Sequence, residues 1–376
     1  MRCVIVGAGI GGLTTANALR DSSMEIVILE RAAAVQEVGA GLSLWCNATK
    51  ALAQLGLESA VGPVGEPIEA VLTLDARGRP LAEIDVKEMD REVGHPSLMV
   101  HRAELQRALL DSIGSRAEVR LGQTCTSVSW QDRRPVVHLA GGERLPADLL
   151  VGADGINSLV RDQVDEAVAP RYAGYTCWRG VAHYEWPSQF PSAVTAAAGG
   201  SQWGMFRMTG GRCYWYLTRN AAPGEHEVDE REAALRTLAN WSRGFSEVIQ
   251  ATEADSVLRD DIYDLPPLNT WTGPRTVLLG DAAHATTPNL GQGACQAIED
   301  AVALQASLQA AAHVQTGIVQ YQRHRKTRAD RVVRRSRQLG RSLQLENRGL
   351  VAVRDRLTRR MPRYVRRQFT SIPMDS

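Results

Sequence analysis

The stretch CVIVGAGIGGL, residues 3–13, decides the fold of this chain. It begins as a short apolar run with β-branched residues, which predicts a buried parallel strand. After the glycines, Leu13, Ala16 and Leu19 recur at helical spacing. A second β-branched run, EIVILE at 25–30, follows and completes a β-α-β unit. Glycines at the first turn of such a unit are typical of a dinucleotide-binding fold.

The glycines of this first turn have different expected roles. Gly7 permits the tight turn, Gly9 leaves the backbone open to a pyrophosphate, and Gly12 lets helix and strand pack closely. The amino end of the helix then offers unpaired N–H groups to the phosphates. Glu30 stands where an acidic residue meets a ribose, and we include its neighbour Arg31 among the candidate cofactor-binding residues.

Two later stretches, GADG at 152–155 and GDAAH at 280–284, each follow a predicted buried strand. Asp281 can accept hydrogen bonds from ribityl hydroxyls. The run PNLGQG then opens a predicted long helix at 293–308, whose amino end can stabilise negative charge on a reduced flavin. We expect an isoalloxazine ring to lie on the backbone of this run, at Pro288, Gly291, Gln292 and Gly293. Together the three stretches indicate one FAD.

Composition narrows the function further. The 376 residues carry a net charge of only +1, which suggests neither nucleic acid nor a strongly anionic partner. The six cysteines are widely spaced without a CxxC pair, and the histidines show no metal-ligand spacing, so we expect no metal. This cysteine usage favours the cytoplasm. The glycine motif starts so early that no signal peptide is expected, and the run at 4–6 is too short to span a membrane.

With VHRAELQR at 100–107 and GADGINSLVR at 152–161, these motifs resemble the group A flavoprotein monooxygenases of the aromatic-hydroxylase superfamily, over roughly residues 1–340. The resemblance implies that Arg102 and Gln106 contact the phosphate–ribose part of FAD. It ties Asp154, supported by Arg161, to both FAD and NAD(P)H. Asn289 departs from urate hydroxylases of this type, which carry an aspartate there, and this speaks against urate as the substrate.

The resemblance also implies an α/β fold: a glutathione-reductase-like, Rossmann-type FAD-binding fold with an inserted, mostly antiparallel substrate sheet and C-terminal helices. We assign residues 1–70, 98–165 and 272–340 to the FAD-binding domain, and residues 71–97 and 166–271 to the substrate domain. We expect residues 341–376 to form a basic helical tail rich in arginine. The tail is interpreted either as a solvated helix face or as a surface for an anionic membrane or a partner.

The reaction that the resemblance implies uses NADH or NADPH to reduce FAD. Dioxygen then adds at flavin C4a, and the distal oxygen passes to an aromatic or heteroaromatic small molecule. Epoxidation of an isoprenoid or other alkene is the alternative within this class, because the motifs also resemble zeaxanthin epoxidase. A reductase or dehydrogenase of the same fold, or a non-catalytic FAD-binding protein, stays open from the sequence alone.

Substrate contacts are expected in the strands of the inserted sheet, where a dry pocket needs apolar walls and few polar anchors. The substrate candidates are Trp178, Trp203, Met205 and Tyr214. The catalytic candidates are Arg212, Tyr216 and His284. Strand alternation places Arg212, Tyr214 and Tyr216 on one face. Sheet packing for the strand residues, and a structural role for His284 at a helix start, are the competing interpretations.

Overall fold

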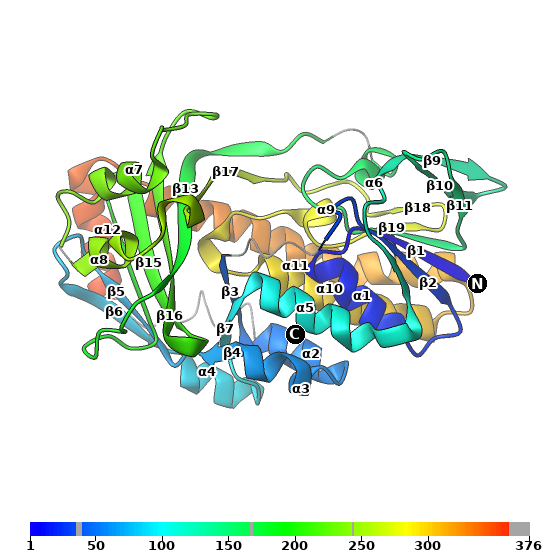
Figure 1. The fold of residues 1–376 in the computed structure, drawn as a ribbon, viewed down its shortest axis with the longest axis horizontal. Coiled ribbons are helices and arrows are strands. Elements are labelled where there is room, and N and C mark those ends of the chain that lie inside the picture. Colours follow the sequence, from blue (N-terminus) through cyan, green and yellow to red (C-terminus); the bar gives the residue numbers. More distant parts are fainter. Residues whose placement is uncertain (35–39, 166–167, 243, 361–376) are drawn as a thin grey trace.

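The computed structural model describes residues 1–34, 40–165, 168–242 and 244–360. Two sheets lie toward opposite ends of the long axis, and the long helices α10 (Gly293–Ala310) and α11 (Val314–Leu343) run between them (Figure 1). Residues far apart in the sequence meet in both sheets, so the site is built from distant segments.

The first sheet has six strands in the order β18-β19-β12-β1-β2-β8. All neighbours are parallel except the edge pair β18–β19. Its strands are β1 (Arg2–Val6), β2 (Glu25–Leu29), β8 (Glu118–Arg120), β12 (Leu149–Gly152), β18 (Thr272–Gly273) and β19 (Thr276–Leu278). The helices α1 (Ile10–Leu19) and α5 (Arg102–Ile113) pack beside it with α10.

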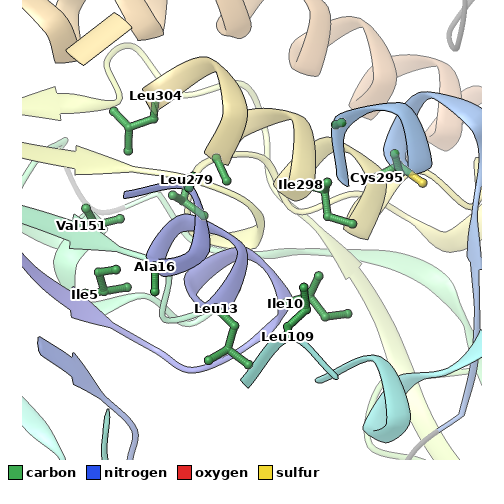
Figure 2. Close-up of a cluster of buried hydrophobic side chains, with 14 of the residues drawn as sticks. Ile5, Ile10, Leu13, Ala16, Leu109, Val151, Leu279, Cys295, Ile298 and Leu304 are labelled. Carbon is green, nitrogen blue, oxygen red and sulfur yellow. The ribbon is translucent and has the colours of Figure 1, made fainter. Parts of the chain in front are cut away.

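The core of this region explains the uninterrupted apolar strands of the sequence. Ile5 of β1 and Val151 of β12 are fully buried, as is Leu13 of α1. Figure 2 shows side chains of α1, the sheet and α10 converging, with Leu279 and Ile298 among them. Strands covered on both faces need apolar residues at every position rather than at alternate ones.

The second sheet has seven strands in the order β17-β13-β16-β15-β14-β5-β6, antiparallel except for the pair β14–β5. They are β5 (Ala70–Leu74), β6 (Pro80–Asp85), β13 (Arg171–His183), β14 (Ala193–Ala198), β15 (Ser201–Met208), β16 (Arg212–Asn220) and β17 (Leu258–Asp264). One face packs against α7 (Glu230–Thr237) and α8 (Gly244–Gln250). The opposite face is turned toward the first sheet's region (Figure 1).

Two small sheets complete the strands. The sheet β3-β7-β4 joins the two main regions, and β9, β10 and β11 form a separate three-stranded sheet at the opposite end from α12 (Figure 1). Their bounds are β3 (Gly41–Leu44), β4 (Gly65–Pro67), β7 (Leu98–His101), β9 (Cys125–Gln131), β10 (Arg134–Leu139) and β11 (Arg144–Pro146). The remaining helices are α2 (Cys46–Gln54), α3 (Glu58–Val61), α4 (Val86–Val93), α6 (Leu159–Asp162), α9 (Asp281–His284) and α12 (Arg348–Arg360).

The predicted α/β fold with an inserted, mostly antiparallel sheet and C-terminal helices is confirmed. The helix predicted at 293–308 is α10. Of the predicted basic tail, the structure describes the end of α11 and all of α12, whereas Arg363, Arg366 and Arg367 lie outside the described residues. Within the described part of the chain, no helix is both long and apolar enough to cross a membrane.

Candidate active site

Four candidate cofactor residues lie along one edge of the six-stranded sheet. The strands β2, β1, β12 and β19 are neighbours in this sheet and run parallel to one another. Their carboxyl ends therefore lie at the same edge. Glu30, Gly7, Asp154 and Asp281 follow these four ends. Open α/β sheets bind their ligands at this edge. The topology therefore brings together motifs that are separated by more than a hundred residues.

The first turn has the geometry that a pyrophosphate site needs. Gly7 has φ of +106°, a conformation that side chains rarely adopt. A Cβ atom on Gly12 would lie 1.9 Å from the carbonyl oxygen of Gly7, so helix and strand pack too closely for any side chain. A Cβ atom on Gly9 would meet nothing within 4 Å, which leaves open space above the amino end of α1. These positions fit the three roles expected of the glycines.

Polar side chains from two other elements converge on Ala8 of the same turn. The Glu30 Oε2 atom accepts a hydrogen bond from the Ala8 N–H at 2.9 Å, and the Gln106 Nε2 atom donates to the Ala8 carbonyl at 2.7 Å. Arg31, after β2, and Arg102, the first residue of α5, have exposed side chains. Exposed cations near this turn suit a phosphate-bearing ligand.

Asp154 shapes the middle loop rather than offering a free carboxylate. Its Oδ1 atom accepts from the Ser158 hydroxyl at 2.5 Å, and its Oδ2 atom accepts from the Leu159 N–H at 2.8 Å. Burial raises the pKa of Asp154, against these hydrogen bonds, which lower it. Arg161 is buried and donates to the Ile156 carbonyl at 2.8 Å. Both side chains hold the loop in position beside the glycine turn.

The acidic side chain of the third motif, Asp281, is exposed and free to bind a ligand. Asp281, the first residue of α9, is exposed, and its carboxylate accepts no hydrogen bond from the described residues. Pro288 is also exposed, and Gly293 begins α10. Gln292 differs, because it is only 3% exposed and its amide bonds with Asn47 and Gln296. Gln292 can therefore face a flavin only with its backbone.

These residues fit FAD. An open turn at Gly9 and the exposed cations would hold the pyrophosphate, and the free carboxylate of Asp281 would accept ribityl hydroxyls. The run 288–293 and the amino end of α10 would lie beneath the flavin ring.

An aromatic wall on the substrate sheet faces this region. It consists of Phe206, Tyr214 and Tyr216, whose ring centroids lie 6.2–6.5 Å apart. Tyr214 also packs on the joining sheet, since a Cβ atom on Gly41 would lie 2.3 Å from the Tyr214 ring. The wall therefore stands where the substrate sheet meets the cofactor region.

A hydroxyl–amide row, formed by Tyr175, Asn289, Gln202 and Tyr216, links this wall to the run 288–293. The Tyr175 hydroxyl donates to Asn289 Oδ1 at 2.8 Å, and Asn289 Nδ2 donates to Gln202 Oε1 at 3.3 Å. Gln202 Nε2 then donates to the Tyr216 hydroxyl oxygen at 2.8 Å. Burial raises the pKa of Tyr216 well above its usual range, so the phenol stays protonated. Tyr216 is thus a hydrogen-bond donor rather than a base.

Gly204 makes room for the ring of Tyr216. A Cβ atom at this position would lie 2.3 Å from Tyr216 Cε1. Sequence reasoning missed Gly204, Gln202 and Phe206, although their spacing in β15 places them on one face.

Three predicted substrate residues lie elsewhere. Trp178, Trp203 and Met205 belong to the core between the sheet and the helices α7 and α8, on the face opposite the aromatic wall. The Trp203 ring lies 4.6 Å from that of Phe245, and Trp178 Nε1 donates to Glu230 at 2.7 Å. Their placement in this outer core argues against substrate contact, and we do not retain them as candidates.

Two predicted catalytic residues also have structural partners. Arg212 makes a two-pronged ion pair with Glu104 of α5, at 2.7 and 3.1 Å, which ties the substrate sheet to the cofactor region. His284 is 3% exposed, and its Nε2 atom lies 2.6 Å from Asp300 Oδ2. Asp300 is held in turn by Arg325 at 2.8 Å. His284 therefore belongs to a buried charge cluster with Asp300 and Arg325, and of the three catalytic candidates only Tyr216 stays in the proposed site.

The fold and the motifs gathered at the carboxyl ends of its strands together define an FAD-binding flavoprotein. A family model described as "FAD binding domain" matches residues 1–336. The aurachin C monooxygenase/isomerase of Stigmatella aurantiaca is 38% identical over 360 residues, covering 95% of this chain and 94% of that protein. The 3-amino-4-hydroxybenzoate 2-monooxygenase of Streptomyces cremeus is 34% identical over 351 residues, covering 92% and 88%.

A crystal structure of Klebsiella pneumoniae HpxO with FAD and uric acid superposes with a TM-score of 0.93 at 27% identity, covering 100% of this chain and 97% of that one. The chain belongs to the FAD binding domain family, and it is an FAD-dependent monooxygenase. The predicted family and cofactor are thereby confirmed.

Proposed function

We propose that the enzyme hydroxylates an uncharged aromatic or heteroaromatic small molecule, with NADH or NADPH as electron donor and dioxygen as co-substrate. The observation that carries this proposal is the aromatic wall bordered by the hydroxyl–amide row. Flat rings pack well on aromatic side chains, and a few polar anchors fix their orientation.

The charges around the wall favour an uncharged substrate. Arg179 and Arg212 lie on the same sheet face as Tyr216, and each is already paired with a carboxylate, Asp260 and Glu104 respectively. A substrate carboxylate would have to compete with Asp260 and Glu104 for the arginines.

The relatives support an aromatic ring, because the name of one specifies a hydroxybenzoate and one solved structure holds uric acid.

Bound FAD supplies the redox chemistry that activates dioxygen. The chain's own part is to bind and orient the substrate and to exclude water. We assign the Tyr216 hydroxyl the role of donor to a substrate oxygen or ring nitrogen, because its oxygen already accepts from Gln202 and its proton is free to donate. The aromatic wall would hold the ring and keep the site dry. We assign FAD binding to the residues of the glycine turn and the polar side chains around it, which are Gly7, Gly9, Gly12, Glu30, Arg31, Arg102, Gln106 and Asp281.

A matched panel tests the proposal. Phenols and hydroxylated nitrogen heteroaromatics are compared with the same rings bearing a carboxylate, while NAD(P)H oxidation and peroxide release are measured together. We expect the uncharged compounds to stimulate oxidation with little peroxide and to give products heavier by one oxygen atom. A preference for the carboxylates would contradict the proposal.

Epoxidation of an isoprenoid alkene is the second candidate. A zeaxanthin epoxidase also matches the chain, although the chain spans about half of that protein's length. The apolar wall could hold an alkene, and an isoprenoid in the same panel separates the two candidates through an epoxide product.

We also infer that the enzyme works in the cytoplasm. All six cysteines are free, which supports a reducing compartment.

A further inference from the structure

An apolar stripe lies on the outer face of α12. Leu350, Val353 and Leu357 are 54%, 56% and 50% exposed, and their spacing places them on one side of the helix. The described residues include only three other exposed large apolar side chains, at Met1, Leu121 and Val228, and these are scattered. A concentrated apolar stripe on an otherwise polar helix marks an interaction surface.

An arginine-lined pocket adjoins the stripe. It has a volume of about 490 Å³ between α12 and the β5–β6 turn, and its charged lining consists of Arg79, Asp355, Arg356, Arg359 and Arg360. Asp75 pairs with Arg79 at 2.7 Å and with Arg359 at 3.6 Å. Arg356 and Arg360 form no ion pair with a described residue. Asp355 is paired with Arg354 at 2.8 Å, so Arg356 and Arg360 leave net positive charge next to the exposed apolar side chains.

The inner face of α12 is fastened to the protein. Arg354 donates to the Ala197 carbonyl of β14 at 2.5 Å and to the Ser342 carbonyl near the end of α11 at 3.2 Å. In the connection between the two helices, Glu346 accepts from Asn220 of β16 at 2.7 Å. These bonds orient the helix, so the stripe and the pocket face outward together rather than as a loose tail.

The charge of α12 indicates which kind of partner can bind its exposed surface. Residues 348–360 hold five arginines and one aspartate, a net charge of +4. Two copies of such a surface would repel each other. An anionic bilayer offers both apolar acyl chains for the stripe and phosphates for the arginines.

We propose that α12 docks this enzyme on anionic phospholipid bilayers, with Leu350, Val353 and Leu357 inserted and Arg356 and Arg360 on the headgroups. α12 packs against β6 at one end of the molecule, so docking would bring the substrate sheet to the bilayer (Figure 1). A lipophilic substrate could then reach the site from the membrane.

Vesicle co-sedimentation tests the proposal with the full-length, FAD-loaded enzyme. The vesicles are pure phosphatidylcholine, or phosphatidylcholine containing about a third phosphatidylglycerol. One variant carries Leu350→Ser, Val353→Ser and Leu357→Ser, and a second carries Arg356→Gln and Arg360→Gln. The matched controls are Val228→Ser for exposed apolar loss, and Arg133→Gln with Arg144→Gln, both exposed and in the β9–β11 sheet region, for charge loss at the far end of the molecule.

We expect the wild type and both controls to sediment with the anionic vesicles and to remain in solution with the neutral ones. Each α12 variant should bind at least about tenfold more weakly, since each basic residue near an anionic surface and each buried apolar side chain contributes. FAD content and melting temperature should be unchanged. Wild type that stays in solution with anionic vesicles would overturn the proposal. So would a stripe-dependent dimer, seen by light scattering, without vesicle binding.

Discussion

The Gln202 amide nitrogen lies 2.8 Å from the Tyr216 hydroxyl oxygen and donates to it. Because the amide fills the acceptor side of the phenol, the phenolic proton is directed to another acceptor. Gln202 is itself tied through Asn289 to the run that would underlie the flavin. The pair therefore sets the direction of the one donor that we assign to the substrate.

Replacing Tyr216 with Phe removes this donor while keeping the ring. We expect kcat/KM to fall by about tenfold, the worth of roughly 1–1.5 kcal/mol for one hydrogen bond, with a larger share of NAD(P)H consumed as peroxide. Tyr184→Phe is the matched control, because the Tyr184 hydroxyl bonds to Glu247 of α8, on the face of the sheet opposite the wall. Equal losses in both variants would remove Tyr216 from the site.

The close approach of Gly204 to Tyr216 predicts a sensitive position without any polar group. In Gly204→Ala the new methyl must displace the Tyr216 ring, so turnover should fall by about tenfold or more while FAD stays bound. Gly141→Ala, where an added Cβ meets nothing within 4 Å, is the control. Steady-state kinetics and the flavin spectrum of both variants decide the matter. Normal turnover in Gly204→Ala would show that the ring position is unimportant.

Gly9→Val separates folding from cofactor binding. The position has an ordinary φ of −72° and open space around it, so the variant should fold and melt like wild type from which FAD has been removed. Its side chain would occupy the pyrophosphate path, and the purified protein should be colourless. Absorbance at the flavin band tests the loss of FAD, and a thermal melt tests whether the variant folds normally. A yellow Gly9→Val protein would contradict the assignment.

Asp281→Ala should weaken FAD without unfolding the chain, since the carboxylate makes no hydrogen bond to a described residue. We expect a loss on the order of 1–3 kcal/mol in FAD affinity, measured by titration of apoprotein. Asp111→Ala, an exposed aspartate of α5, serves as control. Unchanged affinity in Asp281→Ala would place the ribityl chain elsewhere.

His284 is predicted to act on stability. Burial lowers its pKa, but the Asp300 carboxylate outweighs burial and the pKa is raised. The stabilisation by the charged imidazole is therefore complete below the unfolded pKa near 6.5 and is lost as pH rises through the folded pKa. His284→Asn should lower the free energy of unfolding by about 3 kcal/mol at pH 6 and by less at alkaline pH. Denaturant melts at several pH values measure this difference, and a pH-independent loss would rule out the ion pair as its source.

Asp300 determines how the stability of the same cluster responds to low pH. Burial raises its pKa, but the charges of His284 and Arg325 lower it to about 2. The wild type should therefore lose this stabilisation only as pH falls from about 4 toward 2.

The cofactor region could be predicted from the sequence because its signals are local. The turn at Gly7 and the strand entering Asp281 each carry their own pattern, and parallel pairing places them together. The substrate face could not be predicted in the same way. Both faces of the inserted sheet are covered, and the more apolar set, with Trp203, packs permanently on α7 and α8. The face toward the cofactor carries amides and hydroxyls such as Gln202, which alternation alone does not orient.

Long-range partners were also hidden from the sequence. His284 stands three residues after Asp281, which suggests a place beside the cofactor. Its ring instead bonds to Asp300 of α10, whose other carboxylate oxygen accepts from Arg325 of α11. Arg212 likewise reads as a substrate anchor until Glu104 of α5 is seen beside it.

The most direct test supplies ¹⁸O₂ to the purified enzyme with NAD(P)H and the best uncharged aromatic of the panel, and measures the product by mass spectrometry. We predict one labelled oxygen atom in the ring product, formed in step with NAD(P)H consumption. A product without label, or NAD(P)H consumption that yields only peroxide with every aromatic compound, would contradict the account.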